Sequence, residues 1–117
     1  MADLILPRSM VITNTITNYF MTAPTAIALA AATPVDIGIG PQTWLTDTGA
    51  TAAAFIDVSV PVAGHQYAYE LYIDGQKQEE GLITDATATV LELTSATAGT
   101  IPQFARIVYT IVDIGTA

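Results

Sequence analysis

Apolar and polar positions alternate with a period of two along much of the chain, which is typical of β-strands with one buried face. The alternation is clearest near the C-terminus, where one parity holds Ala105, Ile107, Tyr109 and Ile111. In the first long segment the apolar parity holds Met10, Ile12, Ile16 and Phe20. Threonines at 13, 15 and 17 occupy the other parity of that segment. This pattern predicts strands over most of the sequence.

Proline, glycine and Asp-Gly separate the alternating segments into about eight strands. The predicted strands are 9–21, 26–31, 35–39, 53–60, 66–73, 76–83, 86–93 and 104–112. Asp74-Gly75 is the residue pair favoured in a tight type I′ hairpin turn. Segment 40–53 is the longest predicted loop. The alanine-rich run 26–32 is the one helix candidate, and Pro24 and Pro34 limit it to about two turns.

The chain of 117 residues is the size of one domain. Short strands at this spacing predict a single-domain all-β sandwich, jelly-roll-like, with an immunoglobulin-like sandwich as the alternative. We expect residues 1–8 to form an N-terminal arm and residues 9–117 to form the sandwich domain.

The last predicted strand is apolar on both faces, because Val108 and Val112 lie on the parity opposite Tyr109. Such a strand lies in the middle of a packed structure or presents its second face to a partner. Arg106 lies among these apolar neighbours, so we expect its charge to be paired within the chain or across an interface.

The charge balance limits the classes of partner. With 11 acidic and 3 basic residues, the chain carries a net charge of −8, which argues against binding to nucleic acid. The longest apolar run has eight residues (25–32), too short for a membrane span of about 20. The chain has no cysteine and no recognisable secretory signal at its start, so we expect synthesis in a cytoplasm.

Few residues could carry chemistry. His65 is the single histidine and follows a predicted turn, and no Gly-x-Ser-x-Gly nucleophile elbow or zinc-ligand set accompanies it. The run 74–80 is acidic but lacks the spacing of a calcium-binding loop. We therefore predict a protein that is not an enzyme and has no metal or cofactor.

Candidate contact residues lie at the start of the chain and in the long loop. The apolar arm residues Leu4, Ile5 and Leu6, followed by Arg8, are expected to fold back on the core or to add to a neighbour's sheet. Trp44 is a further contact candidate, because its neighbours suggest an exposed loop. With Arg106, Val108 and Val112, these residues form the predicted protein interface.

Read whole, the chain resembles the capsid decoration or cement proteins of tailed bacteriophages. The resemblance rests on threonine-, alanine- and glycine-rich strands such as ITNTIT at 12–17 and ATATVLELTSATAGT at 86–100, and on the acidic, cysteine-free composition. It implies a β-rich subunit, often trimeric, that binds the major capsid protein on the capsid exterior and stabilises the lattice. We therefore expect a virion protein and a homo-oligomer, with a trimer favoured.

Two other functions stay open at the level of sequence. A phage tail or fibre module that binds a carbohydrate or a receptor would use Trp44, Tyr67 and Tyr69 as a stacking platform. A small hydrolase would depend on His65.

Overall fold

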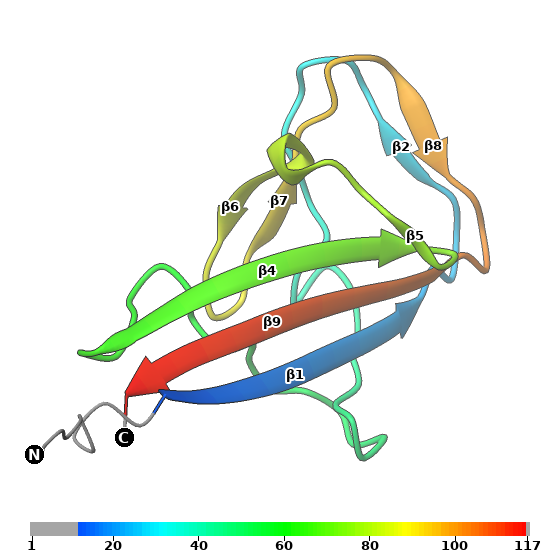
Figure 1. Cartoon of the computed structure of the whole chain (residues 1–117). Helices are drawn as coiled ribbons and strands as arrows, with labels where there is room; N and C mark the ends of the chain where they lie inside the picture. The colour runs from blue at the N-terminus through cyan, green and yellow to red at the C-terminus, as the bar shows by residue number, and fades with distance from the viewer. Residues whose placement is uncertain (1–11, 117) are drawn as a thin grey trace, which may run out of the picture.

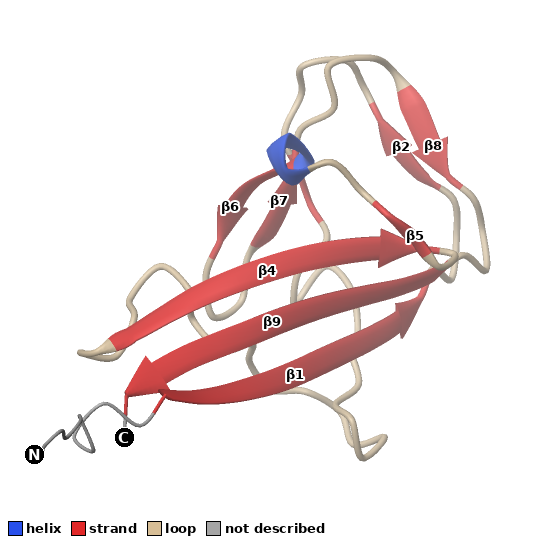
Figure 2. Ribbon diagram, viewed as in Figure 1, coloured by secondary structure: helices blue, strands red, loops and turns tan. Residues whose placement is uncertain are grey.

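The computed structural model describes residues 12–116, which form nine β-strands and one 3-10 helix (Figure 2). The strands are β1 (Ile12–Thr22), β2 (Ile27–Leu29), β3 (Val35–Asp36), β4 (His65–Ile73), β5 (Gln76–Lys77), β6 (Ile83–Ala86), β7 (Leu91–Leu93), β8 (Gly99–Ile101) and β9 (Arg106–Thr116). The 3-10 helix spans Glu80–Leu82. The strands pair into three antiparallel sheets, which confirms the predicted all-β class.

The largest sheet has the strand order β1-β9-β4-β5, and we call it the long sheet (Figure 1). All 11 residues of β1 pair with β9 in one unbroken register. β4 pairs with the other side of β9. β9 therefore lies between β1 and β4 within this sheet, with Ile107, Tyr109 and Ile111 buried on one of its faces.

The small sheets β3-β7-β6 and β2-β8 form a second layer behind the long sheet, together with the segments that connect β3 to β4 (Figure 1). Two β-layers with a shared apolar core make a β-sandwich. The choice between jelly-roll and immunoglobulin-like connections stays a prediction.

Aromatic side chains form the centre of the core between the layers. Phe55 lies edge-on to Tyr19, Trp44 and Tyr109, with ring centroids 5.0, 5.3 and 5.1 Å apart. Trp44 Nε1 donates a hydrogen bond of 2.8 Å to the Ile37 carbonyl oxygen. Buried aliphatic side chains from both layers surround this cluster: Ile37, Leu71, Leu91, Leu93, Ile107 and Ile111.

The core-facing side of β1 is the parity that carries the threonines. Tyr19 and Met21 lie on this parity and are buried, whereas Ile16 and Phe20 face solvent with 60% and 38% of their surface exposed. Tyr19 and Met21 pack in the core between the long sheet and the second layer. An apolar row is thereby left on the outside of the molecule.

The predicted strand 53–60 is wrong, since this segment has no strand in the structure. Phe55 packs in the core, but the backbone then turns at Asp57, whose carboxylate accepts a hydrogen bond of 2.9 Å from Ser59 N. Asp-Ser spacing of this kind forms a turn that competes with strand pairing. The segment that contains Val58 and Val60 therefore pairs with no neighbouring strand, although its apolar residues alternate.

The limits of several other strands differ from the predicted ones, because a short strand ends where its pairing partner ends. The predicted strand 76–83 divides into β5, the 3-10 helix and the start of β6. The predicted strand 86–93 contains the turn between β6 and β7, and β8 was not predicted. The alanine-rich run forms strand β2 and not a helix. At the β4–β5 turn, Asp74 and Gly75 both have positive φ (51° and 81°), which confirms the type I′ prediction.

Candidate functional site

The most distinctive surface of the described chain is the side of the long sheet that faces away from the core, which we call the outer face. Alternation along each strand and the strand register assign its side chains. They are Asn14, Ile16, Asn18, Phe20 and Thr22 from β1, Arg106, Val108, Thr110, Val112 and Ile114 from β9, and Gln66, Ala68, Glu70 and Tyr72 from β4.

Two apolar rows cross the outer face from strand to strand. The first row is Ile16, Val112 and Ala68, and the second is Phe20, Val108 and Tyr72. A polar row of Asn18, Thr110 and Glu70 separates them, and Thr110 Oγ1 donates a hydrogen bond of 2.7 Å to Asn18 Oδ1. Apolar rows on a solvent-facing sheet are typical of surfaces that contact another protein.

A shallow groove lies at the Phe20 end of the outer face. Leu45 exchanges backbone hydrogen bonds of 2.9 and 2.7 Å with Phe20, which fixes its side chain beside β1. The groove is lined by Phe20, Leu45, Val108 and Arg106, with Met21, Thr22 and Ile107 completing it. It therefore combines an apolar wall with one guanidinium group.

Arg106 is exposed and forms no ion pair with another described residue. Its backbone N–H donates a hydrogen bond of 2.9 Å to Asp74 Oδ1, and this bond holds the start of β9. The bond does not involve the guanidinium group, so it does not compensate the charge of the side chain. The sequence predicted a partner for this charge within the chain or across an interface, and no ion-pair partner is found among residues 12–116. A partner across an interface stays a prediction.

The charges at the β4 side of the outer face compensate each other. Lys77 Nζ lies 2.9 Å from Glu70 Oε2, and the Tyr72 hydroxyl donates to Glu70 Oε1 over 3.0 Å. The hydrogen bonds from Lys77 and Tyr72 lower the pKa of Glu70, and the same bond to Glu70 raises the pKa of Tyr72. Lys77 and Arg106 are two of the three basic residues of the chain.

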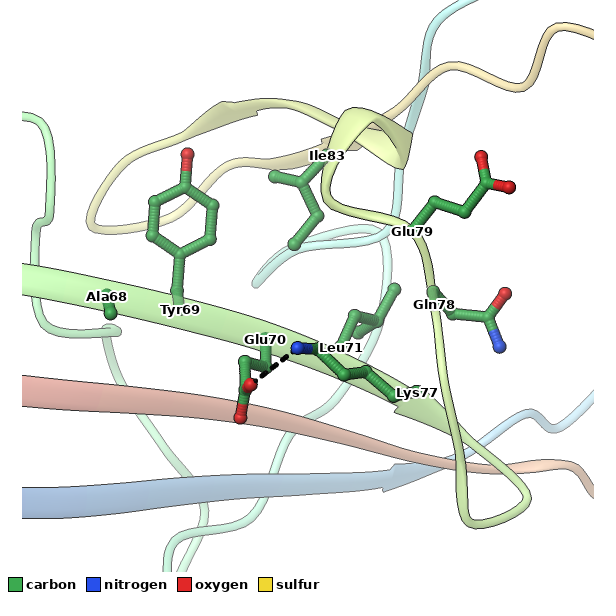
Figure 3. Close-up of a pocket in the computed structure, with 8 residues that line it drawn as sticks. All are labelled: Ala68, Tyr69, Glu70, Leu71, Lys77, Gln78, Glu79 and Ile83. Carbon is green, nitrogen blue, oxygen red and sulfur yellow. Dashed lines mark ion pairs between the residues drawn. The ribbon is translucent and has the colours of Figure 1, made fainter.

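A second pocket lies beyond β4, between that strand and the segment that follows β5 (Figure 3). Tyr69 and Ile83 form its apolar side, and the Glu70–Lys77 ion pair lies at its opposite rim (Figure 3). Ala68, Leu71, Gln78 and Glu79 complete the lining. The pocket brings together no nucleophile with a general base, so we assign it no chemistry.

His65 is the first residue of β4, at the end of the long sheet, rather than a free surface residue. Its Nδ1 lies 2.7 Å from Asp113 Oδ1, and its ring covers Gly115, where an added Cβ would come within 2.6 Å of the ring. Within residues 12–116, no further side chain is hydrogen-bonded to His65, and no three His, Asp or Glu residues are grouped to hold a metal ion. The pair orients the imidazole and fastens β4 to β9.

The predicted contact role of Trp44 requires correction, because its side chain is completely buried. Its indole N–H is satisfied by Ile37, and its ring packs against Phe55 and Tyr109. The flanking polar residues suggested an exposed loop, but Trp44 is the residue that anchors that loop in the core. A carbohydrate platform built on Trp44 is therefore excluded. Tyr67 and Tyr69 lie on the core-facing side of β4, half-buried and partly exposed respectively.

The predicted interface residues divide into three groups. Arg106, Val108 and Val112 lie together on the outer face. Leu4, Ile5, Leu6 and Arg8 lie outside the described residues, and Trp44 belongs to the core. Four further residues of the outer face and its groove were not predicted from the sequence: Ile16, Phe20, Leu45 and Tyr72. The shared parity of Ile16 and Phe20 was visible, but only the register with β9 places them beside Val112 and Val108.

Comparisons of the chain with protein-family models, with curated proteins and with solved structures found no match. Among the described residues, no helix has the length and apolar character to cross a membrane.

Proposed function

We propose that this chain is a structural subunit of a virus particle, a capsid decoration protein that binds the major capsid protein and reinforces the outer capsid lattice. The observation that supports the proposal is the outer face, with its two apolar rows and the groove that contains Arg106. The resemblance of the sequence to decoration proteins supplies the class of partner.

The outer face is held in place by the backbone hydrogen bonds of the long sheet, which suits it to a contact that reinforces a lattice. Its central strand, β9, is hydrogen-bonded on both sides over most of its length, so the face is rigid before a partner arrives. Rigid surfaces lose little conformational entropy on binding. A lattice offers many identical sites, so each individual contact can be weak while the assembled shell gains considerable stability.

The charge distribution gives the subunit an orientation in this proposal. The outer face carries Arg106 and the neutralised Glu70–Lys77 pair, whereas the whole chain has a net charge of −8. An apolar capsid segment flanked by a carboxylate would match the groove. The acidic remainder would face outward, away from the packaged nucleic acid.

The experiment is a binding measurement with emptied capsids of the virus that encodes this chain. Phe20→Asp and Arg106→Glu should each reduce the affinity for the capsid by about tenfold or more, because they place negative charge in the groove. Val60→Asp is the matched control, since Val60 is 70% exposed in the loop before β4. Equal binding of all three variants and the wild type would refute the assignment of the groove.

The N-terminal arm is tested separately by removing residues 1–8. If the arm contributes to docking as the sequence predicts, the truncated chain should occupy fewer capsid sites at the same concentration. Unfolding in urea, compared with the full chain, checks that the sandwich still folds. Unchanged capsid occupancy would exclude a role for the arm.

A further inference from the structure

The outward edge of β1 is an open site for strand pairing. β1 is the last strand on its side of the long sheet (Figure 1). Among the described residues, the only backbone partner on this edge is Leu45, opposite Phe20. The edge is therefore open from Ile12 to Tyr19 with respect to the described chain.

The bonds to Leu45 also show which backbone groups face outward. Phe20 N and Phe20 O both point away from β9, toward Leu45. In an antiparallel strand, the N–H and C=O of one residue point to the same side, and the side alternates from residue to residue. Since the register with β9 is unbroken, Asn14, Ile16 and Asn18 also present their N–H and C=O groups at the open edge.

This edge lacks the features with which proteins usually prevent strand addition. Exposed edges are commonly short, or are interrupted by a charge, a proline or a bulge. β1 has 11 residues, ITNTITNYFMT, without a charged residue or a proline, and it pairs with β9 without a bulge. At the opposite side of the long sheet, β4 and β5 carry Glu70 and Lys77.

The sequence of β1 is self-complementary about Ile16. In an antiparallel pair of two β1 strands with the two-fold axis at Ile16, Ile16 lies opposite Ile16, Asn14 opposite Asn18, and Thr15 opposite Thr17. Like pairs of this kind, apolar with apolar and threonine with threonine, stabilise antiparallel sheets. Since β1 is uncharged, two chains of net charge −8 can meet here without placing like charges opposite each other.

We propose that two copies of this chain form a dimer by antiparallel pairing of their β1 edges about Ile16, which joins the two long sheets into one sheet. Leu45 limits the paired segment to residues 14–18 on each strand, because it occupies the edge at Phe20. This inference does not depend on the proposed capsid function.

The pairing would also extend the outer face. Ile16 is 60% exposed and begins the first apolar row, so the two-fold axis joins the Ile16, Val112 and Ala68 rows of both copies into one continuous row. The Asn18 amide, oriented by Thr110, would lie opposite Asn14 of the second copy. The exposed isoleucine is thus covered by its own counterpart.

The first test is the mass of the chain in solution from low micromolar to near-millimolar concentration, measured by sedimentation equilibrium. The wild type should show a monomer–dimer equilibrium. Ile16→Lys should weaken the dimer by about tenfold or more, because two lysines would lie directly opposite each other. Ile114→Lys is the matched control, since Ile114 is exposed on the same face but lies on the central strand β9. A wild type that is monomeric at all concentrations would overturn the proposal.

The second test determines the register between the two β1 strands by disulfide cross-linking of single introduced cysteines. The natural chain has no cysteine. Residues at the two-fold axis of a hydrogen-bonded pair have Cα atoms about 5.5 Å apart, within reach of a disulfide. Ile16→Cys should therefore form a cross-linked dimer on mild oxidation. Asn18→Cys should not, because its two copies would lie about 13 Å apart along the strands. Cross-linking at Asn14→Cys or Asn18→Cys in preference to Ile16→Cys would overturn the register.

Discussion

At the scale of single residues, the aromatic core combines satisfied and unsatisfied polar atoms. The Tyr19 hydroxyl accepts a hydrogen bond of 3.0 Å from Ile56 N, and the Trp44 indole is bonded to Ile37. The Tyr109 hydroxyl is buried without a hydrogen-bond partner among the described residues. A buried hydroxyl without a partner has lost its hydration and gained nothing in return, so it lowers stability.

Tyr109→Phe should therefore leave the protein equally stable or more stable, by up to about 2 kcal/mol, because it removes only the unsatisfied group. Tyr19→Phe is the matched control and should cost about 1 kcal/mol, since it leaves Ile56 N without its acceptor. Urea unfolding of both variants measures the difference. A Tyr109→Phe variant less stable than Tyr19→Phe would show that the Tyr109 hydroxyl is bonded in solution.

Tyr109 should also dominate the stability of the protein at alkaline pH. Burial raises the pKa of Tyr109 well above its ordinary value of 10.0, because the ionised form cannot be hydrated in the core. The stability linked to this group is fully present below about pH 10 and is lost as pH rises further, since the unfolded chain releases the proton first. Thermal unfolding above pH 10 should therefore show a weaker pH dependence in Tyr109→Phe than in the wild type. Identical pH profiles would contradict this assignment.

Among the elements, the edge strand β5 is placed beside β4 by one tight turn. The β4–β5 turn places Lys77 beside Glu70, and it requires positive φ at Asp74 and Gly75. A residue with a Cβ is strained in this conformation, even where the surrounding space is open. Nothing lies within 4 Å of a Cβ added at Gly75, so backbone strain alone decides the effect there.

Gly75→Ala should destabilise the protein by about 1 kcal/mol through this strain. Gly81→Ala is the control, because an added Cβ there also meets nothing within 4 Å and Gly81 has no positive φ. It should be neutral or slightly stabilising. Urea denaturation measures the free energy of unfolding of each variant. Equal values for the two variants would argue that the turn relaxes to another type.

For the whole molecule, the net negative charge opposes the proposed dimerisation at the β1 edge, because two copies repel each other. Each copy carries a net charge of −8, whereas the paired segment 14–18 is uncharged. Long-range repulsion between the copies is screened by salt, but the hydrogen bonds of the edge are much less affected.

The dimer should therefore become tighter as salt rises from low to physiological concentration. Sedimentation equilibrium at several salt concentrations measures the dissociation constant. Association that weakens with added salt would indicate a contact made by opposite charges, and would contradict pairing at the β1 edge.

The β class, the approximate positions of the long strands and the type I′ turn could all be predicted from the sequence. These features follow from local rules: β-branched alternation fits a pleated strand, and Asp-Gly tolerates positive φ. The two apolar faces of β9 were also visible in the sequence, and a partner for the second face stays a prediction.

Which surfaces are buried and which are exposed depended on how the strands pack together in three dimensions. Trp44 lies in a polar stretch of sequence, yet Phe55 and Tyr109 meet it from distant segments and bury it. In the same way, Ile16 and Phe20 look like core residues by hydropathy, but Tyr19 and Met21 occupy the inner side of β1 and are buried. Alternation fixes two faces for every strand, and the choice of the inner face depends on contacts between residues far apart in the chain.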